Sequence, residues 1–151
     1  GMSAESIDAC SDFAQMISIL PEARTAWSVE GVSAFHDVTE GGIATALAEL
    51  SQAGGKGMRI RRDALPVYPL TARIGDLLGI DPLGLIGSGS LLICCRPEAA
   101  PQIVAALETT SIPVTDIGEV VDTPPGIAAF YKGAPAAWPT FEVDEITRLF
   151  G

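Results

Sequence analysis

The chain has 151 residues, 48% of them hydrophobic and 19% charged, so it has the length of one domain with a sizeable core and is too apolar to be disordered. The net charge of −10 argues against a nucleic-acid partner, because a phosphate backbone is bound by clustered lysines and arginines. No apolar run reaches the roughly 18 residues of a membrane span, and no secretory signal is recognisable at the start. Together with an odd number of cysteines and no CxxC spacing, this predicts a cytoplasmic protein with reduced thiols and no membrane contact.

In the first part of the chain, the sequence predicts two helices, a strand and a third helix. Apolar residues recur at helical spacing until Pro21 interrupts the pattern, and a second helix is expected over Ala23–Val29, with Gly31 as its cap. A short strand is expected at 32–35, and an amphipathic helix at 39–53.

The middle of the chain predicts a strand around Met58 and Ile60, which alternate with arginines. A helix is expected at 71–78, a buried strand at 91–95, and then a helix whose first turn contains Pro97.

Two further strands are predicted at 114–121 and 127–131, and the tight turn between them favours antiparallel pairing. Residues 134–141 look irregular, and a final helix is expected at 143–150 with Asp144 and Glu145 in its first turn. Because strands and helices interleave, the predicted fold class is α/β (α+β), a mixed β-sheet with helices packed on it.

A cluster of cationic residues and a pair of adjacent cysteines are both interpreted as structural rather than functional. Four cationic residues occur within seven positions: Lys56, Arg59, Arg61 and Arg62. They could form a small positive patch, but the preferred interpretation is that they lie on the solvent-exposed face of a strand. Cys94 and Cys95 occupy an apolar strand, in which neighbours point to opposite faces, so they are interpreted as small buried residues. A single histidine does not complete a metal site, and none is predicted.

The stretch His36-Asp-Val-Thr-Glu-Gly-Gly42 holds this histidine and joins a predicted strand to a predicted helix. Asp37 or Thr39 could cap the helix by accepting from a free N–H of its first turn. Two glycines there cost about 1 kcal/mol each relative to alanine, which a special backbone conformation, a close approach of another backbone or a ligand would have to offset. A plain cap and a ligand-facing helix start both remain possible.

A second glycine-rich segment, Gly87-Ser-Gly-Ser90, leads into the strand at 91–95. It lacks the lysine and the following helix of a phosphate-binding P-loop and does not match GxGxxG. A tight loop or bulge is the simpler interpretation, and a ligand-contacting loop is the alternative.

Four segments resemble motifs of a known family and occur in the same order as in that family. They are "HDVTEGGIATALAEL", "GGKGMRIRRDALPV", "LLGIDPLGLIGSGSLLI" and "IPVTDIGEVV". They resemble the C-terminal domain of the aminoimidazole ribonucleotide (AIR) synthase-related superfamily. This superfamily includes AIR synthase, formylglycinamide ribonucleotide synthetase, selenophosphate synthetase and hydrogenase maturation proteins, and the pattern is most similar to the hydrogenase-maturation branch.

The resemblance implies an ATP- and Mg²⁺-dependent enzyme in which the C-terminal domain helps to hold the substrate in a cleft shared with an N-terminal ATP-binding domain. The residues that match the motif at this cleft, or lie in the second glycine loop, are His36, Asp37, Thr39, Gly41, Gly42, Ser88 and Gly89. They are expected to contact substrate or phosphate, and no catalytic or metal-binding residue is assigned.

The expected organisation is an N-terminal helical segment at 1–29, whose Gly1 is typical of a cleaved tag, and the C-terminal-type domain at 30–151. Too few residues precede the motif for the ATP-binding domain, so ATP and Mg²⁺ are expected only in combination with such a domain, and the isolated chain is expected to be inactive. The partner would be an ATP-binding domain or subunit, or a second copy in a homodimer, with a small-molecule substrate possible. The alternative is a non-catalytic ligand-binding or assembly module.

Overall fold

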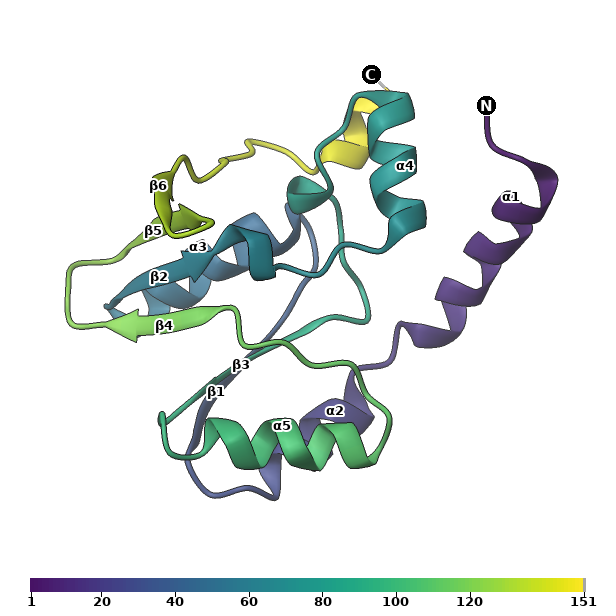
Figure 1. The fold of residues 1–151 in the computed structure, drawn as a ribbon. Helices are drawn as coiled ribbons and strands as arrows, with labels where there is room; N and C mark the ends of the chain where they lie inside the picture. The colour runs from purple at the N-terminus through teal and green to yellow at the C-terminus, as the bar shows by residue number, and fades with distance from the viewer. Residues whose placement is uncertain (151) are drawn as a thin grey trace.

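Helices surround two small sheets in the computed structural model, which describes residues 1–150 (Figure 1). The α-helices are α1 (Ala4–Cys10), α2 (Leu20–Trp27), α3 (Gly42–Gly54), α4 (Pro69–Leu78) and α5 (Ala100–Thr109). Short 3₁₀ helices are η1 (Ser11–Met16), η2 (Arg62–Ala64), η3 (Pro82–Gly84) and η4 (Glu145–Leu149). The strands are β1 (Val32–Asp37), β2 (Gly57–Arg61), β3 (Leu91–Cys95), β4 (Gly118–Val121), β5 (Gly126–Tyr131) and β6 (Ala134–Ala136).

The strands form an antiparallel pair, β1–β3, and a mixed sheet in the order β4-β2-β5-β6. Within the mixed sheet β2 is parallel to β5 and antiparallel to β4, and β5 is antiparallel to β6. The predicted class, a mixed β-sheet with helices packed on it, is confirmed, and the antiparallel pair β1–β3 forms a second sheet.

The β1–β3 pair separates two apolar cores. Leu92 and Cys94 of β3 belong to the core beneath α3, whereas Ile93 and Cys95 belong to the core formed with α2 and α5. This alternation is the two-residue period of a strand, and it confirms that the two adjacent cysteines face opposite sides. Figure 1 shows α2 and α5 on one side of β1 and β3, and α3 on the other. The strand pair therefore lies between α3 on one side and α2 and α5 on the other.

The predicted pairing of the strands at 114–121 and 127–131 is wrong. Both β4 and β5 pair with β2, which lies between them. The connection contains Pro124 and Pro125, which favour extended backbone and do not suit a two-residue hairpin turn. It passes over the end of β2 instead, where the Gly57 N–H donates to the Thr123 carbonyl at 2.9 Å.

Several boundaries differ from the prediction for local reasons. The helix after β3 begins at Ala100, so Pro101 rather than Pro97 occupies its first turn. Gly31 has a positive φ of 110° but follows the cap of α2, which is Ser28. The final helix is the 3₁₀ helix η4.

Part of the segment interpreted as irregular forms strand β6. It pairs with β5 across a turn in which Lys132 and Gly133 both have positive φ, as a tight hairpin requires. No helix among residues 1–150 combines the length and the apolar character that crossing a membrane requires.

Candidate substrate-contact site

The two glycine-rich segments lie beside each other at one end of the β1–β3 pair. Asp37 is paired with Leu91, and just beyond it the Val38 N–H donates to the Ser90 carbonyl at 3.1 Å. A Cβ on Gly87 would lie only 2.8 Å from Cγ1 of Val38. Residues 36–42 and 87–90, which are about fifty positions apart in the sequence, therefore form one continuous surface.

The side chains that this surface exposes are hydroxyls and carboxylates. The first segment contributes exposed Asp37, Thr39 and Glu40, and the second contributes exposed Ser88 and Ser90. Neither segment contains a lysine or an arginine. We call these five exposed residues the polar rim; its hydroxyls can donate or accept, and its carboxylates accept.

The glycine pair that opens α3 has a structural explanation. Gly41 and Gly42 both have left-handed backbones, with φ of 77° and 64°. A Cβ on Gly42 would lie 2.5 Å from the carbonyl oxygen of Leu83 and 2.7 Å from that of Leu85. Two of the three explanations considered from the sequence, a special conformation and a close backbone approach, therefore apply here. A ligand contact at these glycines stays a prediction.

The sequence predicted that Asp37 or Thr39 caps α3, but neither side chain does so. Gly41 occupies the cap position, and its N–H donates to Oδ2 of Asp144 at 2.8 Å. Asp144 lies 103 positions later in the chain and is buried, with only 3% of its surface exposed. The carboxylate at this helix start, where the helix dipole favours negative charge, is supplied by the C-terminal segment.

The neighbouring carboxylate, Glu145, binds a second backbone N–H. Its Oε2 accepts from the N–H of Asp81 at 2.8 Å, and both of its oxygens accept from Nη1 of Arg148. The hydrogen bond from Asp81 and the bond from Arg148 lower the pKa of Glu145 below its ordinary value, against the effect of burial. The sequence placed both acids at a helix start, but nothing in it signals their distant partners.

His36 is engaged within the chain at both ring nitrogens. Nε2 lies 2.9 Å from Oε2 of Glu49 on α3, and Nδ1 lies 2.6 Å from the carbonyl oxygen of Asp37. About a quarter of the side chain is exposed. The ring therefore ties β1 to α3, and its expected role toward a ligand stays a prediction.

Ser88 and Gly89 differ in their surroundings. Ser88 is exposed, whereas Gly89 has a φ of 98° and faces the end of η1. A Cβ on Gly89 would lie 3.0 Å from the carbonyl carbon of Met16. Gly89 thus allows the N-terminal segment to pack on the loop, and Ser88 is the residue of this pair that is free to meet a ligand.

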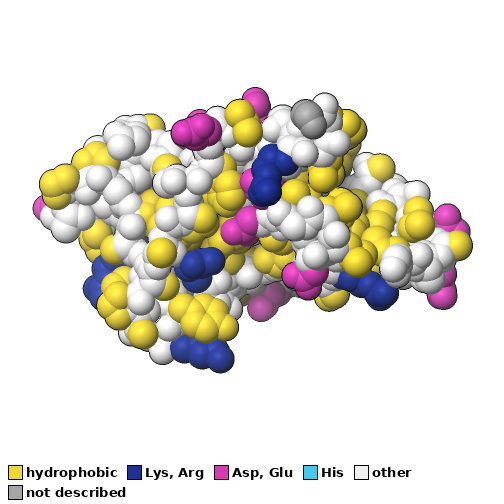
Figure 2. Space-filling view, turned by 90° about the horizontal axis from the view of Figure 1, so that it is seen from above, with side chains coloured by type: hydrophobic (Ala, Val, Ile, Leu, Met, Phe, Trp, Pro, Cys, Tyr) yellow, Lys and Arg dark blue, Asp and Glu magenta, His cyan; other side chains and the backbone are white. Residues whose placement is uncertain are grey.

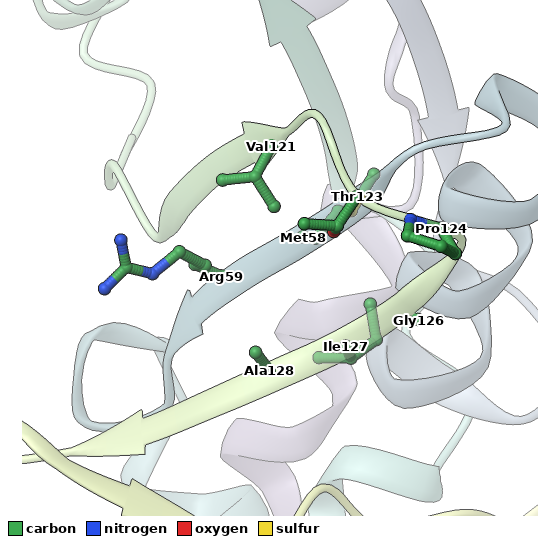
Figure 3. Close-up of a pocket in the computed structure, with 8 residues that line it drawn as sticks. All are labelled: Met58, Arg59, Val121, Thr123, Pro124, Gly126, Ile127 and Ala128. Carbon is green, nitrogen blue, oxygen red and sulfur yellow. The ribbon is translucent and has the colours of Figure 1, made fainter.

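Two cavities lie away from the polar rim. One of about 570 Å³ lies over β2, between β4, the connection that follows it and β5, and Figure 3 shows its eight lining residues. Another, of about 210 Å³, lies beside η3 and includes Arg62 and Tyr131. Neither contains a residue of segments 36–42 or 87–90. The five residues of the rim are exposed and lie outside both of these cavities.

The four clustered cations do not form a free positive patch. Three of them pair with carboxylates on or next to β4: Lys56 with Asp122 at 2.7 Å, Arg59 with Glu119 at 3.2 Å and Arg61 with Asp116 at 2.9 Å. Arg62 donates to the carbonyl of Ala137. The solvated strand face is confirmed, and in Figure 2 charges of both signs are scattered among hydrophobic side chains.

The adjacent thiols are not activated nucleophiles. Burial, followed by the neighbouring Cys95, raises the pKa of Cys94; burial, followed by Asp116, raises that of Cys95. Such thiols stay protonated at neutral pH. Both side chains are only partly buried where they pack against the two cores, so the prediction that they are buried holds in part.

Fold and surface together define a mixed α+β domain with a polar, glycine-rich rim at one end of the β1–β3 pair. The family described as "AIR synthase related protein, C-terminal domain" matches residues 9–129, and the chain belongs to this family.

Among its relatives, carbamoyl dehydratase HypE of Escherichia coli (strain K12) is 35% identical over 106 residues, which cover 69% of this chain and 32% of the relative. The crystal structure of E. coli HypE has a TM-score of 0.74 and 32% identity, with 87% of this chain and 42% of that chain covered. The predicted family is confirmed, and the similarity to HypE proteins agrees with the predicted resemblance to the hydrogenase-maturation branch. The chain spans about a third of the length of this relative.

Two further solved structures share the fold. One is a HypE–HypF complex, with a TM-score of 0.71, 22% identity, and coverage of 82% of this chain and 41% of that one. The other is HypE in complex with ATP, with a TM-score of 0.66, 24% identity, and coverage of 74% and 36%.

Proposed function

We propose that this chain acts as the substrate-contacting domain of an ATP-dependent enzyme of the hydrogenase-maturation type, at a cleft shared with an ATP-binding domain. The observation that carries the proposal is the polar rim itself, because the fold brings two distant glycine-rich segments into one exposed surface without enclosing it. Further support is the 35% identity to a carbamoyl dehydratase and the likeness in fold to a HypE protein solved with ATP.

The residues of the rim do not fit ATP and Mg²⁺ by themselves. A triphosphate needs cationic or N–H-rich surroundings, whereas the rim carries two carboxylates and no cation. Among residues 1–150 no group of three or more histidine, cysteine or acidic side chains is arranged to hold a metal. In this proposal both the nucleotide and its metal belong to the other domain, and no chemical step is assigned to them here.

The rim suits a small polar substrate group such as an amide or carbamoyl group. Thr39, Ser88 and Ser90 can donate to a carbonyl oxygen, while Asp37 and Glu40 can accept from an amide N–H. Such contacts would orient the group toward the ATP-binding domain, so the contribution of this chain to catalysis would be positioning.

The test is a two-dimensional NMR titration of the ¹⁵N-labelled chain with carbamoyl phosphate, inorganic phosphate and ATP. We expect shifts confined to residues 36–42 and 87–90 with carbamoyl phosphate, and their loss in a Thr39→Ala/Ser88→Ala variant. Ser33→Ala, exposed on β1, is the matched control. Shifts located elsewhere, or unchanged in the double variant, would count against the proposal.

One observation favours the second candidate function, an assembly module. The N-terminal part of the chain exposes large apolar side chains, namely Ile7 (58%), Ile17 (59%), Leu20 (59%) and Trp27 (72%). Exposed apolar surface of this kind is typical of protein interfaces. An assembly module would form a complex or a dimer that depends on these residues while showing no rim shifts in the titration.

A further inference from the structure

The smaller of the two cavities lies between the connection after β2, the start of η3 and the end of β5. Its volume is about 210 Å³, and its wall combines one cation, one carboxylate, a tyrosine and apolar side chains. It contains no residue of segments 36–42 or 87–90. Pockets for drug-sized ligands measure about 300–1,000 Å³, so this cavity has room for a small metabolite and not for a nucleotide.

The apolar part of the cavity is supplied by Leu65, Pro82 and Leu83. Leu65 and Leu83 belong to the core beneath α3, with only 9% and 8% of their surface exposed. The packing of this core therefore fixes the floor of the cavity. A hydrocarbon group that lies on the floor is stabilised by about 25 cal/mol for each Å² of apolar surface that it removes from water.

The charged part of the cavity consists of Arg62 and Asp81, which are both half-buried and do not pair with each other. The ion pairs among residues 1–150 involve neither of them. Arg62 donates through Nη1 to the carbonyl of Ala137 at 2.8 Å, and Asp81 accepts through Oδ1 from the N–H of Leu83 at 2.9 Å. Nη2 of Arg62 and Oδ2 of Asp81 keep their capacity for a ligand.

We propose that this cavity binds a small zwitterion, namely a free α-amino acid with an aliphatic side chain. Its carboxylate pairs with Arg62, because a guanidinium matches the geometry of a carboxylate, and its ammonium donates to Asp81. Its side chain lies on Leu65 and Leu83. A ligand with both charges matches both walls, whereas a simple acid or a simple amine leaves one charge of the cavity without a partner.

This inference does not depend on the proposed function, because the cavity and the polar rim share no residue. An NMR titration of the ¹⁵N-labelled full chain with L-leucine tests it. We expect saturable shifts of the amides of residues 62–65, 81 and 83 at leucine concentrations below about 10 mM. The absence of saturable shifts there, or shifts only elsewhere in the chain, would overturn the proposal.

Two fragments of leucine test the need for both charges. 4-Methylpentanoate lacks the ammonium and 3-methylbutylamine lacks the carboxylate, while both keep the aliphatic side chain. Each should bind at least tenfold more weakly than leucine, since each loses one charge-assisted contact. Equal affinities of the three compounds would show that the cavity recognises only the hydrocarbon part, and this result also overturns the proposal.

Two substitutions, Asp81→Asn and Arg62→Gln, remove the charges of the cavity one at a time. Asparagine still accepts from the N–H of Leu83, so the start of η3 is kept. Each variant should bind leucine at least tenfold more weakly, and Asp81→Asn should bind 4-methylpentanoate as the wild type does. Asp63→Asn is the matched control, because Asp63 is exposed and lies next to Arg62 in the sequence.

The control should keep the wild-type affinity for leucine. Wild-type affinity in Asp81→Asn, or an equal loss in the control, would overturn the proposal. If Arg62→Gln fails to fold, the comparison of leucine with 3-methylbutylamine on the wild type tests the contact with the guanidinium instead.

Discussion

Gly42 combines a left-handed backbone with two carbonyl oxygens within 2.7 Å of a Cβ position. Gly42→Ala should therefore lower the free energy of unfolding by about 2 kcal/mol, since both conformation and space oppose a side chain. Urea denaturation measures the change. Gly54→Ala is the control, because a Cβ at this last residue of α3 meets nothing within 4 Å, and it should leave stability unchanged or slightly raised. Equal losses in both variants would contradict the explanation of the glycine pair.

Glu145 makes stability depend on pH in the acid range. Its pKa is lowered in the folded chain from an ordinary value of 4.5, first by the Asp81 N–H and then by Arg148. The stabilisation is therefore present above the unfolded pKa and is lost as the pH falls through the folded one. Glu145→Gln should reduce stability at pH 7 by about 1–2 kcal/mol, and the gap to the wild type should narrow as the pH falls below the ordinary pKa of 4.5.

Melting temperatures recorded from pH 3 to pH 8 measure this gap. Glu142→Gln, in the same segment but exposed, should follow the wild-type curve. A gap for Glu145→Gln that stays constant at all pH values would show that its ionised form is not what the fold stabilises.

At the scale of elements, Ser51 joins α3 to the mixed sheet. Its hydroxyl donates to the carbonyl of Lys56 at 2.6 Å and accepts from the N–H of Gly126 at 2.8 Å, and its exposed fraction is 1%. Ser51→Ala should cost about 1–3 kcal/mol, because it leaves polar backbone groups without their partner. Chemical denaturation should show this loss in the free energy of unfolding for Ser51→Ala and almost no loss for Ser33→Ala. If Ser51→Ala leaves the free energy of unfolding unchanged, water replaces the hydroxyl.

Local patterns predicted which elements form better than they predicted how they pair. The strand at 91–95 and the helix at 71–78 appear where apolar periodicity placed them, the latter with two extra residues at its start. The pairing of β4 with β2 could not be derived, because Pro124 and Pro125 argue against a tight hairpin but do not indicate which strand lies next to β4. Strand β6 is short, and two of its three residues are alanines, so it carries almost no pattern.

At the scale of the whole molecule, the candidate site was predictable in part. The motif placed residues 36–42 at a strand end, and the resemblance linked them to residues 87–90, which the structure brings into contact with them. The link from Asp144 to Gly41 was not predictable, because a contact across 103 positions leaves no periodic or local signal. The exposed rim agrees with the proposed cleft between this domain and a second one.

The most direct test of this account is a hybrid enzyme in which this chain replaces the matching region of E. coli HypE. The hybrid is assayed for ATP turnover beside the isolated chain, and its Thr39→Ala/Ser88→Ala variant is compared by both turnover and melting temperature. We predict turnover by the hybrid, at least a tenfold loss in the double variant at an unchanged melting temperature, and no turnover by the isolated chain. Two results would contradict these predictions: a folded hybrid whose turnover is unchanged by the double substitution, or ATP hydrolysis by the isolated chain.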